Sequence, residues 1–512
     1  MSSFAQAGPT GSLPYSRSTA QATPTRMLRV VLWVMTAVGT LAVLAHFGLA
    51  FWAQNEFTQP ESIVAVQARM LDQTGKIYYA LKDYPYTVCA YMPLGYELQA
   101  ILQGAGVPPL LAGRLISMTA FCALIWLVWR MLLLYSGDSR CAWLGAALCG
   151  CTSGLPFWGT VGQVDMLAVT LALAAFYQFS RHWMRGTATL PWATLLVILA
   201  LFTKQTVVAA PVAIVIALWL RSSNAAMAFT LITAGCGMAL VLMADGILQG
   251  RFLANTVYAN INPYAWEKIE QHGTFWLIAS AQLALIVAAG ARPLWRSAAR
   301  PVLIYTGLSL AVLVLTAGKI GSDSNYQLES AVLLILSASL ALHALGFFDV
   351  VFTGAKGWVS LLVMPLLIHA VLGVRLEQAN LLGRVAKEMQ FAEQMKKLPG
   401  IVNTRGRVLS ADSNALVHLG RSIEVEPLIY RLMVESGRID PERLRQDLAA
   451  ARFSAVVLYH DVAEKAELHV EIPTLTKAQL EAVGARYRKV AFVPGPNAGG
   501  LHVYEPRVRL PQ

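Results

Sequence analysis

Polar and ionisable residues recur at one end of successive apolar stretches in this 512-residue chain. Glu61 follows the first apolar stretch, and Glu56 comes between that stretch and Glu61. A carboxylate in this position is chemically suited to accept a proton from an attacking hydroxyl as a general base. The alternative for Glu61 is an ordinary solvated acid of a loop, and for Glu56 a charge that only marks an interface.

A second carboxylate and a lone lysine stand at the ends of later apolar stretches. Asp165 is the first residue of the run DMLAVTLALAAF. It is either a second active-site acid or an acid in the first turn of a helix, where the helix dipole stabilises it by about 0.3–1 kcal/mol. Lys204, beside Gln205, separates two short apolar runs. Its ammonium is suited to bind an anion, either a phosphate or the carboxylate of Asp165. The alternative is a lysine that snorkels to the membrane–water interface. Arg251 is a further phosphate-binding candidate or an interfacial arginine.

The segment SNYQLE, at 324–329, adds polar side chains to the same end of the chain's apolar part. Ser324 and Gln327 have the spacing of a capping box, which predicts the start of a helix. Asn325 and Glu329 fall on one face of that helix. The aromatic segment between 84 and 96 is expected to form a rigid wall. The residues predicted to line a cavity are Tyr91, Pro93, Asn325, Tyr326 and Glu329.

Long apolar stretches position these residues. The chain is 56% hydrophobic and only 13% charged, about half the charged fraction of a soluble domain. Apolar runs between Leu28 and Val374 approach the roughly 20 residues that a transmembrane helix needs. Hydropathy predicts about eleven spans, at 28–54, 108–135, 139–156, 162–180, 190–203, 206–220, 225–247, 273–291, 301–317, 326–347 and 358–375.

The charges between the spans predict the orientation. One set of flanks holds mostly arginines, and the other holds almost every acidic residue of the apolar part. Basic flanks lie in the cytoplasm, so the N-terminus is predicted inside, and the loop 55–106 and the C-terminal part outside. The polar residues then define a cavity that opens outward. A transporter needs polar groups near the midplane and access from both faces, so this pattern favours a one-sided active site.

Composition divides the chain into a cytoplasmic disordered tail (1–27), a membrane part (28–375) and an extracytoplasmic domain (376–512). The last part holds 19 of the 40 Lys+Arg and 16 of the 29 Asp+Glu residues. Strands are predicted at 407–412, 453–460, 490–494 and 501–504, and helices at 427–436, 441–452 and 476–485. The net charge of +11 is explained by basic flanks rather than by a nucleic-acid partner. A disulfide among Cys89, Cys149 and Cys151 is left open.

Several stretches together resemble a known family: PESIVAVQARMLDQTGKIYY with YMPLGYELQA, GQVDMLAV, FTKQTVVAAP, GSDSNYQLE, and the tail segment LSADSNALVHLGR. They are similar to GT-C fold glycosyltransferases of the group related to the protein O-mannosyltransferases and the aminoarabinose transferases. The resemblance implies a polytopic α-helical membrane protein with about eleven transmembrane helices and a C-terminal extracytoplasmic α/β domain. It covers nearly the whole chain through short motifs.

The resemblance also implies an activity. It is an inverting transfer of a sugar from a polyprenyl-phosphate donor to a glycan, lipid or protein acceptor, at the outer face of a bacterial inner membrane. By position, Glu61 matches the catalytic base, Asp165 the second carboxylate and Lys204 a cation near the phosphate; Gln205 and Arg251 are assigned to the phosphate with it. The alternative functions are a flippase or transporter of polyprenyl-linked glycans and an O-antigen polymerase-type protein.

Two departures from the family pattern bear on these assignments. Pro60 precedes Glu61 where relatives have Asp-Glu or a glycine, which leaves Glu56 as the alternative base. Met92 stands where some relatives have a lysine, so more of the phosphate binding falls to Lys204. No cofactor is evident. Some relatives use a divalent metal, and here only Glu61 and Asp165 are candidate ligands.

Overall fold

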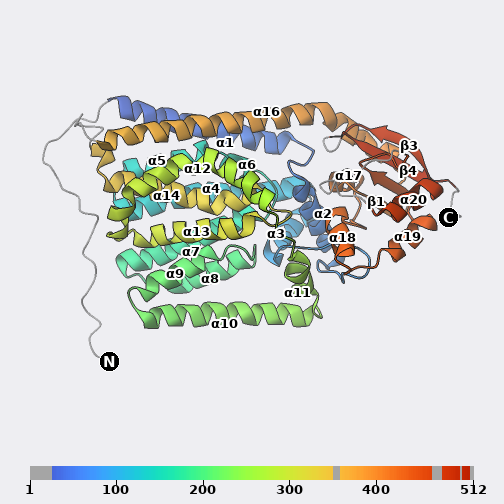
Figure 1. Cartoon of the computed structure of the whole chain (residues 1–512), viewed down its shortest axis with the longest axis horizontal. Helices are drawn as coiled ribbons and strands as arrows, with labels where there is room; N and C mark the ends of the chain where they lie inside the picture. The colour runs from blue at the N-terminus through green and yellow to red at the C-terminus, as the bar shows by residue number, and fades with distance from the viewer. Residues whose placement is uncertain (1–25, 350–357, 464–474, 496–498, 508–512) are drawn as a thin grey trace.

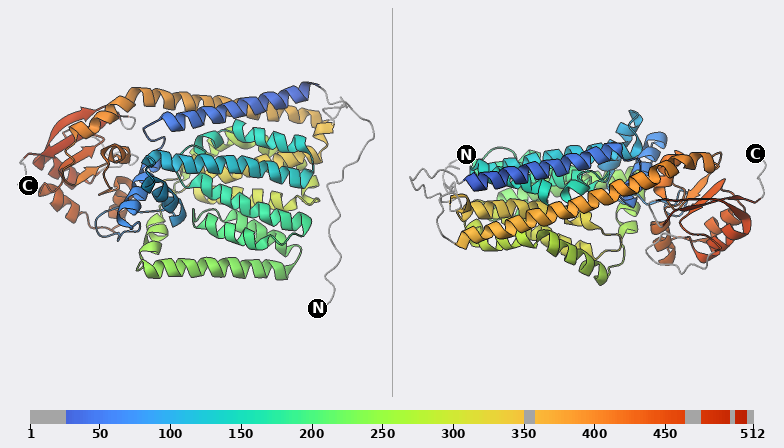
Figure 2. Two further views of the ribbon diagram at one scale, coloured as in Figure 1. Left: turned by 180° about the vertical axis from the view of Figure 1, so that it is seen from behind. Right: turned by 90° about the horizontal axis from the view of Figure 1, so that it is seen from above.

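The computed structural model describes residues 26–349, 358–463, 475–495 and 499–507. Almost all of the predicted tail 1–27 lies outside these residues. The chain forms a long helical bundle with a smaller α/β domain at one end (Figure 1). The N-terminal and C-terminal ends of the described chain lie at opposite ends of the molecule (Figure 2).

Each predicted span overlaps one main helix of the bundle, although several of these helices extend beyond their spans. The helices are α1 (Arg26–Trp52), α4 (Pro109–Ser136), α5 (Ser139–Cys151), α7 (Asp165–Arg185), α8 (Leu190–Leu201), α9 (Ala209–Trp219), α10 (Ser223–Ile247), α12 (Trp266–Trp295), α13 (Arg300–Ala317), α14 (Leu328–Ala344) and α16 (Val363–Ile401). Among the described helices, 6 are long and apolar enough to cross a membrane. The number of eleven crossings therefore stays a prediction.

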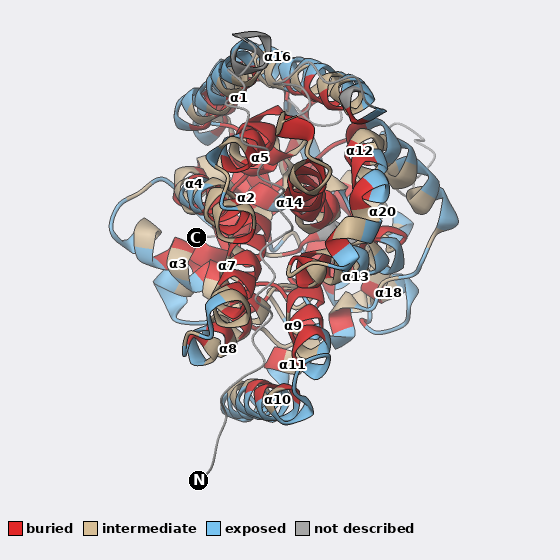
Figure 3. Cartoon of the chain, turned by 90° about the vertical axis from the view of Figure 1, so that its left-hand side faces the viewer, coloured by how far each residue is buried: buried red, intermediate tan, exposed pale blue. Residues whose placement is uncertain are grey.

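Burial follows the position of each helix in the bundle. α14 and α5 are mostly buried at its centre, whereas α1, α16 and α10 on the rim expose much of their surface (Figure 3). Small residues allow the central helices to approach closely. A Cβ added to Gly290 of α12 would lie 2.4 Å from the Cβ of Ala341 in α14. Exposed apolar side chains on the rim, such as those of α10, fit a lipid environment.

The segment 55–106 is not the open loop that its polarity suggested. It contains α2 (Gln59–Thr74) and α3 (Pro93–Gly104), which pack against each other and against α4. α2 has a proline in its first turn and ends at Gly75, which adopts a left-handed conformation with φ 65°. These two helices and the irregular chain between them separate the bundle from the α/β domain (Figure 1).

α16 crosses the predicted domain boundary at 376. Its 39 residues make a helix about 58 Å long, at 1.5 Å per residue. The hydrocarbon core of a bilayer is only about 30 Å thick, so one continuous helix can both line the bundle and carry the C-terminal domain. α16 lies beside α1 along the bundle and then reaches the α/β domain (Figures 1 and 2).

The C-terminal domain is built on a four-stranded sheet with the order β1-β2-β4-β3. β1 (Val408–Ser410) and β2 (Ala455–Leu458) are parallel, and β4 (Leu501–Pro506) is antiparallel to β2 and to β3 (Tyr487–Val493). The helices α18 (Pro427–Glu435), α19 (Glu442–Ala449) and α20 (Lys477–Arg486) correspond to the predicted ones, whereas α17 (Ser413–Leu419) was not predicted. All six cysteines are free thiols, so the structure contains no disulfide among them.

Candidate active site

A cavity of about 350 Å³ lies where the bundle, the segment 55–106 and the C-terminal domain meet. Most of its polar lining comes from turns between helices. The residues that line it are Gln59, Pro60, Ile63, Val64, Gln67, Val88, Ala90, Tyr91, Tyr96, Lys204, Gln205, Thr206, Thr256, Val257, Asn260, Asn262, Lys319, Ile320, Gly321, Tyr326, Ser413, Glu426, Ile429 and Leu432.

Lys204 occupies the turn between α8 and α9 and is buried. Its ammonium forms an ion pair with Asp165, the first residue of α7. The same carboxylate oxygen of Asp165 accepts a hydrogen bond of 3.0 Å from Nδ2 of Asn325. The Lys204 ammonium also lies 4.4 Å from the centre of the Tyr326 ring. Four predicted site residues, from three segments that are far apart in the sequence, are thus in contact, and Lys204 and Tyr326 face the cavity.

Lys319, in the turn after α13, adds a second cation to the cavity. Its Nζ donates a hydrogen bond of 3.1 Å to Oδ1 of Asn260. Burial and the charge of Lys204 lower the pKa of Lys319. No carboxylate forms an ion pair with Lys319 among the described residues. Because Asp165 already balances Lys204, the uncompensated charge is that of Lys319, and an ammonium without a carboxylate partner in a partly buried cavity favours a bound anion.

Amide side chains hold the segments around these lysines together. Nε2 of Gln205 donates to the carbonyls of Ala90 and Thr256, at 2.9 and 3.1 Å. Nδ2 of Asn260 donates to the same Ala90 carbonyl at 2.8 Å. Tyr91, the next residue, lines the cavity. Gln205 is therefore part of the cavity framework as well as of its wall.

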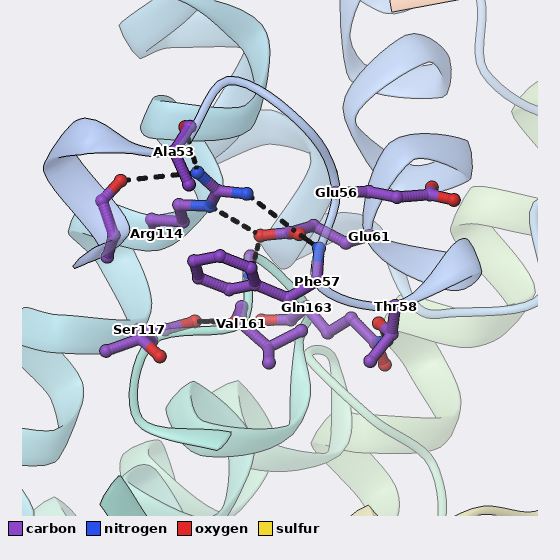
Figure 4. Close-up of polar contacts among 12 residues, drawn as sticks. Ala53, Glu56, Phe57, Thr58, Glu61, Arg114, Ser117, Val161 and Gln163 are labelled. Atoms are coloured by element: carbon purple, nitrogen blue, oxygen red, sulfur yellow. Dashed lines mark hydrogen bonds and ion pairs between the residues drawn. The ribbon is translucent and has the colours of Figure 1, made fainter. Parts of the chain in front are cut away.

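Glu61 does not line the cavity, and its carboxylate is held in a buried network of polar contacts (Figure 4). Its carboxylate accepts hydrogen bonds from Nε and Nη2 of Arg114, at 2.9 and 3.2 Å. The backbone amides of Gly162 and Phe57 donate to it as well, at 2.9 and 2.6 Å. Both side chains of the ion pair are almost completely buried, with exposures of 1% for Arg114 and 0% for Glu61. The network joins α2, α4 and the turn before α7.

The helical geometry of α2 explains why Glu61 does not line the cavity. Residues 59, 60, 63, 64 and 67 form the face of α2 that does. Consecutive residues of a helix point in directions about 100° apart, so the neighbour of Pro60 faces the bundle instead. The sequence placed Glu61 in a loop, where no such constraint applies. The assignment of Glu61 as base stays a prediction, but the structure does not bring its carboxylate to the cavity.

Glu56 lies elsewhere, pointing away from the Glu61–Arg114 pair in Figure 4. It lines a separate pocket of about 310 Å³ together with Arg384, Lys387 and Glu388 of α16. Its backbone amide donates to Oδ1 of Asn414 at 3.2 Å. Neither of the two acids considered as base therefore lines the cavity that holds the lysines.

Three further predicted residues lie outside the cavity lining. Arg251 is exposed at the start of α11 (Arg251–Thr256), and its guanidinium donates to the Gln249 side chain at 3.5 Å. Pro93 begins α3. Glu329 accepts a hydrogen bond of 2.6 Å from the Tyr305 hydroxyl.

The predicted capping box at Ser324 is wrong in detail. Residues Ser324–Gln327 form a short 3-10 helix, and the residue before it, Asp323, provides the cap by accepting from the Ser324 amide. The Ser324 hydroxyl instead accepts a hydrogen bond of 3.1 Å from the Trp158 indole. The turn still presents Asn325 and Tyr326 to Asp165 and Lys204.

The two acids considered as metal ligands do not form a metal site in this arrangement. Glu61 is paired with Arg114, and Asp165 with Lys204. A cation already neutralises each carboxylate. Within the described parts of the chain, no three histidine, cysteine, aspartate or glutamate side chains are grouped so that they could hold a metal ion.

An apolar groove meets the cavity at Gln205, which lines both. The groove has a volume of about 540 Å³ and is formed by α8, α9 and α10 with nearby chain. Its lining residues are Met92, Leu201, Phe202, Gln205, Pro211, Val212, Val215, Phe229, Thr230, Thr233, Ala234, Gly237, Met238 and Val241. A cavity that contains two cations thus adjoins an apolar groove between membrane helices.

Comparison with known proteins identifies the fold. No family model matches the chain, and no curated protein matches it. It is similar to the crystal structure of ArnT from Cupriavidus metallidurans bound to undecaprenyl phosphate, with a TM-score of 0.58 and 13% identity over 94% of this chain and 98% of that one. The archaeal oligosaccharyltransferase AglB from Archaeoglobus fulgidus, in complex with an inhibitory peptide and a dolichol-phosphate, has a TM-score of 0.52 and 12% identity, over 94% and 75% of the respective chains.

These similarities confirm the predicted fold class. The chain has the GT-C fold: a polytopic α-helical membrane part followed by a C-terminal α/β domain.

Proposed function

We propose that this protein transfers a sugar from a polyprenyl-phosphate donor to a hydroxyl of a cell-envelope acceptor, at the outer face of the membrane. The observation that carries the proposal is the pair Lys204 and Lys319 in one cavity, where Lys319 has no carboxylate partner among the described residues. The GT-C fold, shared with proteins solved with undecaprenyl phosphate and dolichol-phosphate, supports it. The acceptor is a glycan, a lipid or a protein.

In this proposal the two lysines bind the donor phosphate. Transfer breaks the bond between the anomeric carbon and the phosphate oxygen, so negative charge grows on the phosphate as it leaves. Fixed cations in a partly buried cavity stabilise that charge in the transition state. Asp165 is a positioning residue that holds the Lys204 ammonium, with Asn325 completing the arrangement. The acceptor attacks from the face opposite the phosphate, which inverts the anomeric centre.

The apolar groove of α8, α9 and α10 is proposed to hold the polyprenyl chain. Its lining is almost entirely apolar, and it adjoins the cavity at Gln205. A lipid tail in the groove would place its phosphate beside Lys204. The donor then enters the groove from the bilayer, and its sugar occupies the cavity next to the phosphate.

Lys319→Ala tests the phosphate site more cleanly than Lys204→Ala, because removal of Lys204 leaves Asp165 buried without its cation. Purified protein is incubated with a panel of undecaprenyl-phosphate-linked hexoses and pentoses and with membranes that supply acceptors, and release of undecaprenyl phosphate is measured. We expect Lys319→Ala to lower kcat/KM at least tenfold, because one charge-assisted contact contributes about 1.5–3 kcal/mol. The control is Lys396→Ala, on the exposed surface of α16. Equal turnover in Lys319→Ala and wild type would contradict the assignment.

A further inference from the structure

The C-terminal domain contributes one acid to the cavity, Glu426, which the donor site does not use. Of the described residues that line the cavity, only Glu426 carries a carboxylate. It stands beside Ser413, Ile429 and Leu432 of the same domain, and the lysines belong to the membrane part. The cavity therefore has a cationic side from the bundle and an acidic side from the C-terminal domain.

The backbone around Glu426 is fixed against the segment between α2 and α3. The Tyr86 amide donates to the Glu424 carbonyl at 2.9 Å, and the Glu426 amide donates to the Tyr86 carbonyl at 2.8 Å. Tyr86 and Val425 form a parallel bridge. The rings of Tyr86 and Tyr430 pack with centres 5.2 Å apart. Glu426 immediately precedes α18, so the start of this helix is held in the same place.

The carboxyl group of Glu426 is buried and weakly held. The exposed fraction of the residue is 4%. The Val88 amide donates to Oε2 at a distance of 3.5 Å, and no lysine, arginine or histidine pairs with it in the described chain. Burial raises the pKa of Glu426 to about 7, with the Val88 amide and the Thr87 hydroxyl acting in the opposite direction. The nearby titratable groups are Cys89 and Tyr91, and Lys204 and Lys319 also line the cavity.

We propose that Glu426 is the general base of the transfer and that the C-terminal domain forms the acceptor subsite around it. This rests on the function proposed above. The acceptor oxygen forms a bond to the anomeric carbon while its proton passes to the Glu426 carboxylate. The bond from the anomeric carbon to the phosphate breaks, and its electron pair stays on the phosphate held by Lys204 and Lys319. Water removes the proton from Glu426 after the products leave.

The position and chemistry of Glu426 suit this role. A general base works best when its pKa lies near the operating pH, because it is then both ionised and basic. An acceptor hydroxyl that lies between Glu426 and the lysines would have the proton-accepting carboxylate on one side. The leaving phosphate, held by the lysines, would be on the other side, as inversion requires. Neither Glu61 nor Asp165 lines the cavity, and each is paired with a cation.

The test compares Glu426→Gln, Glu426→Asp and the control Glu424→Gln in the full-length protein. Glu424 lies on the same segment but pairs with Arg407, at 2.8 Å. Turnover of the undecaprenyl-phosphate sugar panel is measured between pH 5.5 and 8.5, and binding of undecaprenyl phosphate alone is measured by native mass spectrometry. We expect Glu426→Gln to lower kcat by about 10²–10⁴-fold, the usual contribution of a general base, with undecaprenyl phosphate binding unchanged.

The pH dependence gives a second readout. In the wild type kcat should rise with pH up to about 7, as Glu426 ionises, and then level off. Glu426→Gln should lose this rise, and Glu426→Asp should keep it at a lower rate. The neutral amide avoids the cost of burying a charge, so Glu426→Gln should fold at least as stably as wild type at pH 8. Its stability can be checked by heat denaturation.

The outcomes separate the two proposals. Wild-type kcat and an unchanged pH profile in Glu426→Gln would overturn the role of Glu426 and leave the transferase intact. An equal loss in Glu424→Gln would also overturn it, because the effect would then follow from disturbing the segment. A wild-type protein that neither binds undecaprenyl phosphate nor turns over any donor would overturn the proposed function, and the role of Glu426 with it.

Discussion

Replacement of Glu61 by glutamine distinguishes a structural carboxylate from a catalytic one. The substitution keeps the size of the side chain and removes its charge. In the structure this charge balances the Arg114 guanidinium, which is 1% exposed and also lies 3.9 Å from the centre of the Phe57 ring. We expect Glu61→Gln to destabilise the protein, and the folded fraction to retain most of the wild-type kcat.

The magnitude follows from the contacts that remain. Removal of one partner of a buried ion pair costs about 3–5 kcal/mol, because the other charge stays buried. Arg114 would still donate to the carbonyls of Ala50, Ala53 and Asn55, at 3.2, 2.6 and 2.6 Å. The free energy of unfolding should therefore fall by about 3 kcal/mol, the lower end of this range. Arg114→Gln should cost more, because Glu61 would keep only the amides of Phe57 and Gly162.

The assay is heat denaturation of purified protein in detergent at one scan rate, paired with turnover measured on the folded fraction. Glu97→Gln, an exposed acid of α3, is the matched control and should change stability by no more than about 0.5 kcal/mol. The double variant Glu61→Gln/Arg114→Gln should be more stable than the sum of the single effects predicts. An unchanged Tm in Glu61→Gln with kcat lowered about 10²–10⁴-fold would refute the structural role and favour Glu61 as base.

Two further substitutions test the framework and the lipid groove. Gly113→Ala should destabilise the protein by about 1–3 kcal/mol, because its Cβ would lie 2.7 Å from the Gly162 carbonyl oxygen; a wild-type Tm would contradict this close packing. Gly237→Phe should place a ring in the groove, at a position where no atom lies within 4 Å of the added Cβ. It should slow turnover of long-chain polyprenyl donors more than short-chain ones, whereas Gly235→Phe, also open but outside the groove lining, should not.

Hydropathy and helix signals were enough to locate the helices of the bundle, because each apolar run is bounded by polar or helix-ending residues. The sequence offered Asp165 as one of two partners for Lys204, and the structure shows this ion pair, with Asn325 donating to the same carboxylate. All three residues stand at the same end of their spans, and antiparallel helices bring such ends together. The strands predicted in the tail at 407–412, 453–460, 490–494 and 501–504 likewise overlap the four strands of the C-terminal sheet.

The direction in which individual side chains point could not be predicted from the sequence in the same way. The polarity of 55–106 concealed α2, although Pro60 near its start and Gly75 at its end are helix signals. A helix predicted for this segment would have placed Gln59 and Ile63 on one face and Glu61 on another. Lys319 closely follows the predicted span at 301–317, but its position next to Lys204 depends on how α13 packs.

The position of Glu426 in the cavity depends on a contact between distant segments, which the local sequence does not predict. The residues 424–426 lie against Tyr86, more than 300 positions earlier in the chain. The same interface contains the Tyr84 ring, 4.2 Å from the Arg407 guanidinium, and an ion pair of 2.7 Å between Asp83 and Arg443. The exposed ion pair contributes little to stability, so the aromatic and backbone contacts hold this part of the interface. Elsewhere α17 packs against α2, and Arg69 of α2 donates to the Leu416 carbonyl.

This arrangement makes the proposed reaction depend on the interface between the two domains. The bundle holds the cations for the phosphate, and the C-terminal domain holds the one carboxylate that lines the cavity among the described residues. A shift of the C-terminal domain would move Glu426 without moving Lys204 or Lys319. Donor binding would then persist while proton transfer failed, since reacting groups must be within hydrogen-bonding reach. Changes confined to the Tyr86–Tyr430 contact should therefore lower kcat and leave the affinity for undecaprenyl phosphate unaltered.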